Sequence, residues 1–321
     1  MNKVPVKKIW LIIRIVISAL LLFILFQLFD LSAIPALFRN IAGKNIIVTL
    51  LLIFLSVMVS TQKWKLLIYS QNLCVSFREL FFAYLTGQFF NNFLPSSIGG
   101  DAARVLYVGK KRGLIPEFTA SVIAERILAT VSLSLLGLAG SLFSVHKNFT
   151  AVIILVSVFI ASAGLFVLLI IGYLPPFLRQ GFGTAGQKIR DASQSIRRIR
   201  KKPFSVIASF VFSIIFQIIV ALVVFSILNA FNITHISFID IVFITSAVSV
   251  LSMIPVGING YGLREGSYVL LLASYGVGAD TAVSISILFA LLVSIFSISG
   301  LFTWLLKDSI NILHLPERNL L

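Results

Sequence analysis

The sequence contains few of the residues on which enzymes and disulfide-bonded proteins depend. Of its 321 residues, one is cysteine, three are histidine and 12% are charged. The single cysteine, Cys74, excludes an intrachain disulfide and a cysteine-rich metal site. The histidines are far apart, and no His-Glu-x-x-His, Walker A or Cys-x-x-Cys pattern occurs. We therefore expect no enzyme activity, no cofactor and no metal.

What the chain has in excess is hydrophobic residues, which make up 59% of it. No soluble domain has this balance. Six apolar runs are long enough to cross a hydrocarbon core of about 30 Å. These runs are 9–29, 46–69, 118–144, 150–174, 204–230 and 281–306. No convincing cleavage site follows the first run, so we interpret it as a retained span rather than a signal peptide. The prediction is an all-α polytopic membrane protein with one integral membrane domain, 1–321.

The formal net charge of +15 is distributed by side of the membrane. Most Lys and Arg residues fall in loops and ends on one side. Only Arg39, Lys44 and Lys147 fall on the other side, while Arg126 and Arg264 lie within or beside apolar segments. This positive-inside bias places both termini in the cytoplasm. We expect a multi-pass protein of a prokaryotic cytoplasmic membrane, with no nucleic-acid partner.

Two apolar segments, 79–98 and 237–257, end in sequences rich in proline and glycine. Non-helical backbone at membrane depth is tolerated only where protein buries it or where it lines a wet cavity. A shorter amphipathic stretch follows each break, so we predict two re-entrant hairpins, 79–112 and 237–275. The residues assigned to the breaks are Pro95, Gly99, Gly100, Pro255, Gly257, Gly260, Gly262 and Gly266.

The two halves of the chain correspond to each other. The first half, 9–174, and the second half, 204–306, each contain one hairpin, and each hairpin opens on a Ser-Phe pair. One hairpin is expected to open inward and the other outward, which makes an inverted repeat suited to alternating access. The basic cytoplasmic linker 175–203 joins the halves, either as a solvated loop or as an interfacial segment held by anionic headgroups.

Several polar residues accompany these breaks. Arg104 and Arg264 follow the glycine-rich turns, where helix N-termini and a guanidinium together suit a phosphate. Arg126 lies inside an apolar run, and its guanidinium can donate two hydrogen bonds to one phosphate. These three are the lipid- or anion-binding candidates, with interfacial anchoring and structural ion pairing as the alternatives. The candidates for a polar path or for ion pairs are Asp101, Glu125, Glu265, Asn91 and Asn92.

From about residue 10 to 307, the chain resembles the flippase-like family, which comprises the transmembrane region of lysylphosphatidylglycerol synthases and its stand-alone relatives. The resemblance rests on three motifs: Asn91-x-x-Leu94-Pro95 leading to Gly100-Asp101-x-x-Arg104; Glu125-Arg126; and Pro255 leading to Gly260-x-Gly262-x-Arg264-Glu265-Gly266. Two positions depart from the family pattern. Asp101 stands where Glu is more common, and Ala129 stands where an acidic residue is common.

This resemblance implies a membrane lipid as partner. In the two-part synthases this region is associated with moving aminoacylated phosphatidylglycerol between leaflets, while a cytosolic domain transfers lysine. We expect no such transferase domain here, because the last predicted span ends close to Leu321. The leading hypothesis is a transporter or flippase that moves or binds an anionic phospholipid or a polyprenyl- or glycolipid-type substrate.

Two alternatives remain open. One is a membrane subunit that presents phosphatidylglycerol to a separately encoded synthase or serves a glycosyltransferase. The other is an intramembrane enzyme with Glu125 as general acid or base.

Overall fold

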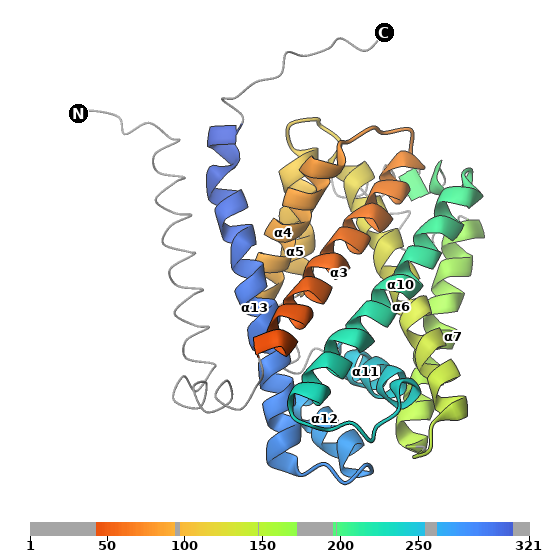
Figure 1. The fold of residues 1–321 in the computed structure, drawn as a ribbon. Coiled ribbons are helices and arrows are strands. Elements are labelled where there is room, and N and C mark those ends of the chain that lie inside the picture. Colours follow the sequence, from red (N-terminus) through yellow and green to blue (C-terminus); the bar gives the residue numbers. More distant parts are fainter. Residues whose placement is uncertain are drawn as a thin grey trace.

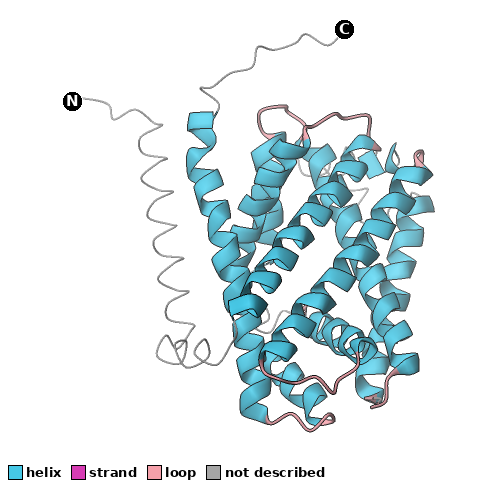
Figure 2. Cartoon of the chain, viewed as in Figure 1, coloured by secondary structure: helices cyan, strands magenta, loops and turns pink. Residues whose placement is uncertain are grey.

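The computed structural model describes residues 43–93, 97–146, 148–171, 195–196, 198–253 and 262–310. Over this part of the chain the secondary structure is helix and loop, without strands (Figure 2). The all-α prediction is thereby confirmed for these residues. Several sequence predictions lie outside them: the first span 9–29, most of the linker 175–203, and the break residues Pro95, Pro255, Gly257 and Gly260.

Five helices of the described part are long and apolar enough to cross a membrane. They are α3 (Gly43–Tyr69), α6 (Ile115–Phe143), α7 (Phe149–Ile171), α10 (Pro203–Ala230) and α13 (Ala279–Ile310). Their positions confirm five of the six predicted long apolar helices to within a few residues at most ends. Proline in the first turn helps to start α6 and α10, because its fixed φ suits a helix and its missing N–H has no intrahelical partner there.

Shorter helices form two hairpins at opposite ends of the bundle (Figure 1). The first consists of α4 (Phe77–Phe93) and α5 (Ser97–Gly109), and the second of α11 (Phe238–Ser252) and α12 (Leu263–Ala273). The longest of these, α4, has 17 residues. At about 1.5 Å per residue it extends about 25 Å, less than a hydrocarbon core of about 30 Å.

The two arms of the first hairpin pack unusually closely. A Cβ atom on Gly100 would collide with the carbonyl oxygen of Gly87, and one on Gly87 would lie 2.8 Å from the carbonyl oxygen of Gly100. The side chain of Asn91 accepts a hydrogen bond of 3.0 Å from the Gly100 N–H. At the open end, Arg112 donates to both oxygens of Glu79 at 2.7 and 2.8 Å. The hairpin is therefore fastened near its tip and at its open end.

The glycines of the breaks differ from expectation. Gly99 and Gly100 lie in the first turns of α5 and Gly266 lies inside α12, so the prediction that they belong to non-helical breaks is wrong. For Gly100, the absence of a side chain serves close packing rather than an unusual φ. Gly262 does have a positive φ of 86° as the residue preceding α12, where glycine avoids a steric penalty.

The long helices pack through small and polar residues as well as apolar ones. Helix α3 lies along α10, where Thr49 donates to the Ser226 hydroxyl at 2.9 Å. Helix α13 lies along α4, where the missing side chain of Gly300 lets the backbone of Leu85 approach. Helices in lipid gain little from the hydrophobic effect between them, so such close contacts carry much of their association.

The glycine contacts generate a stability prediction. We expect Gly100→Ala and Gly300→Ala each to destabilise the protein by about 1–3 kcal/mol, because the new methyl group meets backbone that must shift. Thermal unfolding in detergent measures this. Gly164→Ala in α7 is the matched control, since its Cβ would meet nothing within 4 Å. Equal melting temperatures for all three variants would contradict the close packing.

Candidate functional site

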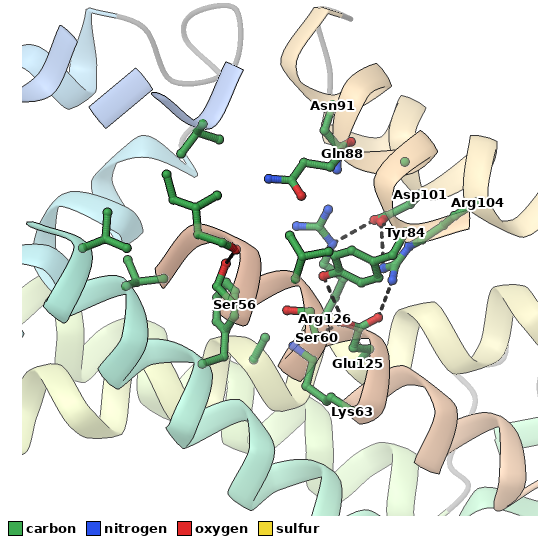
Figure 3. A pocket seen from close by; sticks show the side chains of 18 of the residues that line it. Ser56, Ser60, Lys63, Tyr84, Gln88, Asn91, Asp101, Arg104, Glu125 and Arg126 are labelled. Atoms are coloured by element: carbon green, nitrogen blue, oxygen red, sulfur yellow. Dashed lines mark hydrogen bonds and ion pairs between the residues drawn. The ribbon is translucent and has the colours of Figure 1, made fainter. Parts of the chain in front are cut away.

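A cavity of about 280 Å³ lies inside the bundle, between α3, the first hairpin, α6, α10 and α13. One part of its wall is polar, and Figure 3 shows these side chains converging from several helices. They are Ser56, Ser60, Lys63, Tyr84, Gln88, Asn91, Asp101, Arg104, Glu125 and Arg126. Another part of the wall is apolar and includes Ile53, Val57, Val220, Val223, Phe289 and Val293.

Glu125 is the centre of the polar wall. Its carboxylate accepts from Arg104 Nη1 at 2.6 Å and lies 3.2 Å from Lys63 Nζ. The Tyr84 hydroxyl donates to the same carboxylate at 3.4 Å. The side chains of Glu125, Lys63 and Arg104 are only 3–4% exposed, so these charges depend on one another rather than on solvent.

Arg104 projects from α5 into this cluster, and all three nitrogens of its guanidinium donate hydrogen bonds. Besides Nη1 on Glu125, its Nε and Nη2 donate to Asp101 Oδ1 at 3.1 and 2.8 Å. The guanidinium carbon lies 4.8 Å from the Trp64 ring centroid and 4.9 Å from that of Tyr84. Two aromatic rings and two carboxylates thus replace water around a buried cation.

Arg126, the residue after Glu125, has a different environment. Its Nε donates to Asp101 Oδ2 at 2.8 Å, so Asp101 bridges two arginines. The Arg126 side chain remains 44% exposed, compared with 4% for Arg104. Of the three cations that line the cavity, Arg126 is therefore the most accessible to a ligand.

Gln88 adds an uncharged polar group to the wall. Its Oε1 atom is buried and has no hydrogen-bond partner among the described residues. A buried acceptor of this kind is costly unless water or a ligand donates to it. The cavity therefore offers an acceptor as well as basic groups.

The two asparagines of the predicted polar path support the hairpin. Asn91 holds the Gly100 N–H, as described above, and also lines the cavity. Asn92 Nδ2 donates to Ser297 Oγ on α13 at 2.8 Å. Both side chains therefore fix the end of α4, one against α5 and the other against a long helix.

The arginine of the second hairpin lies in a separate cluster. Arg264 donates to Glu265 Oε1 at 3.2 and 2.9 Å and to Ser286 Oγ at 3.1 Å. The Glu265 carboxylate also accepts from the Gly262 N–H, which ties it to the start of α12. None of these residues lines the cavity. The described structure thus brings Arg104 and Arg126 together but leaves Arg264 apart.

A buried carboxylate also anchors the second hairpin. Asp240 of α11 accepts from Ser144 Oγ at 2.7 Å, from the Val145 N–H at 3.1 Å and from the Tyr275 hydroxyl at 2.7 Å. Burial raises the pKa of Tyr275 to about 12, and the Asp240 carboxylate adds to this rise. Tyr275 therefore stays a hydrogen-bond donor at physiological pH, and the hairpin is held against the α6–α7 loop.

Sequence reasoning missed several residues of the site, above all Lys63, Trp64, Tyr84 and Gln88. Lys63 carried a signal, because it lies inside the predicted apolar run 46–69 and ionisable residues at such depth usually face a partner or a cavity. The two aromatic residues had no comparable signal in the sequence. Trp64 and Tyr84 are distinguished only by their contacts with Arg104.

The chain was compared with models of known protein families. The family described as the lysylphosphatidylglycerol synthase TM region matches residues 11–300. The chain belongs to this family. Among curated proteins and among solved structures, none matches it significantly.

Membership identifies the chain as a membrane protein of the flippase-like family and confirms the resemblance predicted from the motifs. The match is to the transmembrane region of the synthases, and no catalytic domain is detected.

The ion-pair cluster generates a second stability prediction. We expect Glu125→Gln to destabilise the protein by about 3–5 kcal/mol, because Lys63 and Arg104 stay buried after losing a shared counter-ion. Glu79→Gln removes a carboxylate from an exposed pair with Arg112 and should cost about 0–1 kcal/mol. Thermal unfolding of the two variants in one detergent tests this, and a similar small shift for both would exclude a structural role for the cluster.

Proposed function

We propose that this protein binds a phosphate-bearing lipid in the cavity and moves it between the leaflets of the membrane. The observation that carries the proposal is the division of one cavity wall into charged and apolar parts. A lipid headgroup needs hydrogen bonds and a counter-charge, whereas its chains need apolar contact. A cavity with both properties inside a membrane bundle suits an amphiphile better than an ion or a fully polar solute.

The charges favour an anionic headgroup. Three basic side chains, Lys63, Arg104 and Arg126, line the cavity with two carboxylates, Asp101 and Glu125, which leaves one positive charge in excess. Of these cations, Arg126 has the most exposed side chain, and a guanidinium binds phosphate oxygens well. An anionic phospholipid or a polyprenyl phosphate fits this chemistry.

The arrangement of the hairpins supports transport rather than binding alone. In our proposal both are re-entrant, and the halves of the chain form an inverted repeat. Helices α4 and α5 lie at one end of the bundle and α11 and α12 at the other (Figure 1). Broken helices in the two halves of an inverted repeat are typical of alternating-access carriers.

Cysteine labelling tests this topology. The native Cys74 is exposed, as is Lys111 beyond α5, so Cys74 and Lys111→Cys should react from the cytoplasmic side. Thr234 and Ser274 flank the second hairpin, and cysteines there, in a Cys74→Ser background, should react only from outside. Labelling of Cys74 and Lys111→Cys from opposite sides would show that the first hairpin crosses the membrane.

Reconstitution tests the function itself. Proteoliposomes with the wild-type protein should move a fluorescent anionic phospholipid between leaflets faster than empty vesicles. Arg126→Gln should weaken binding of that lipid about tenfold or more, because one charged hydrogen-bonding group is lost. Arg112→Gln, which removes an arginine from the exposed pair outside the cavity, is the matched control. Binding without movement would instead favour a subunit that presents lipid to a partner synthase.

A further inference from the structure

Asp101 occupies a position between two guanidinium groups. Its Oδ1 accepts from Arg104 at 3.1 and 2.8 Å, and its Oδ2 accepts from Arg126 at 2.8 Å. The Asp101 side chain is 16% exposed and lines the cavity. A carboxylate held in this way presents its oxygens to arginine much as a phosphate would. The Asp101 carboxylate therefore already occupies the place beside Arg126 where a phosphate would bind.

We propose that Asp101 is an internal counter-ion for Arg126 and that the phosphate of an incoming headgroup binds Arg126 by displacing it. This inference rests on the function proposed above and assigns a specificity-determining role to Asp101. A neutral or zwitterionic headgroup, which brings no net negative charge, competes poorly with a carboxylate already in place. Asp101 thereby discriminates against lipids that the apolar wall alone would accept.

The two carboxylates of the cavity, Glu125 and Asp101, differ in how easily a ligand can displace them from their partners. Glu125 is held by Lys63, Arg104 and Tyr84, which come from three different helices, and is 4% exposed. Asp101 is held by two arginines, one of which is 44% exposed. Replacing a partner of a half-exposed ion pair costs far less than uncovering a buried one. Displacement therefore takes place at Asp101, while Glu125 keeps Arg104 in position.

Displacement of Asp101 from Arg126 also affects the first hairpin. Asp101 belongs to α5 and Arg126 to α6, so their ion pair links the first hairpin to a long helix. Because α5 is closely packed on α4, it is expected to respond together with α4. A headgroup on Arg126 thus removes one of the ties between the hairpin and α6.

Binding of a short-chain phosphate lipid tests the inference without requiring transport. Isothermal titration in detergent would compare dihexanoyl phosphatidic acid with dihexanoyl phosphatidylcholine and with inorganic phosphate. Asp101→Asn keeps the shape of the side chain but removes its charge, and should raise affinity for the phosphatidic acid about threefold to tenfold. Glu79→Gln is the matched control, since it removes a carboxylate paired with arginine outside the cavity. The gain should vanish in Asp101→Asn combined with Arg126→Gln.

The outcomes separate this inference from the proposed function. Unchanged or weaker binding by folded Asp101→Asn would overturn the counter-ion role, even where the wild type moves lipid. An equal gain for inorganic phosphate would support the counter-ion role while contradicting recognition of a lipid. If Asp101→Asn does not fold, Asp101→Ser gives the same comparison. Failure of both to fold would assign Asp101 to stability alone and overturn the inference.

Discussion

The buried pair of Arg104 and Glu125 is the interaction on which the first half of the molecule depends. Neither charge would be stable in a membrane interior by itself, since transfer from water to a medium of low dielectric costs several kcal/mol per ion. Each therefore needs further partners. Lys63 supplies a second cation from α3, and Trp64 and Tyr84 cover the guanidinium. Two long helices, α3 and α6, and both arms of the first hairpin are thus fixed relative to one another by one cluster.

The hairpin makes this cluster possible by delivering Arg104 to the required depth. Helix α5 can lie against α4 because glycine occupies both sides of the contact, at Gly87 and Gly100. Asn91 then fastens the start of α5 through its backbone N–H. In lipid, such contacts are more decisive than apolar area, because the surrounding chains are as apolar as the protein surface. Close backbone packing and charge burial therefore depend on each other.

The two hairpins reach similar shapes by different interactions. In the first, Arg104 pairs with Glu125 of another helix, so its contacts span the bundle. In the second, Arg264 pairs with the adjacent Glu265, and the longer-range anchor is the carboxylate of Asp240. The cavity is associated with the first of these arrangements. Sequence correspondence between the halves thus does not extend to equivalent use of the matched arginines.

Features that depend on local composition could be predicted from the sequence alone. Apolar runs such as 46–69 correspond to long helices because a segment that crosses the hydrocarbon core must pair its backbone groups internally, whatever the neighbouring helices are. The sequences rich in proline and glycine likewise indicated where the shorter helices α4 and α11 end. Charge inside an apolar run drew attention to Glu125 and Arg126, whereas Arg104 was indicated by the glycine-rich turn before it.

The pairing of these residues, in contrast, follows from the packing of the helices and could not be predicted. Which faces of two helices meet depends on packing over the whole bundle, and no spacing in the chain encodes that Lys63 meets Glu125. Gly100 illustrates the same limit. Its sequence context indicated a break, whereas the backbone is helical and the glycine is required by a neighbour many residues away. The bridging position of Asp101, between two arginines of different helices, likewise exists only once α5 is packed against α6.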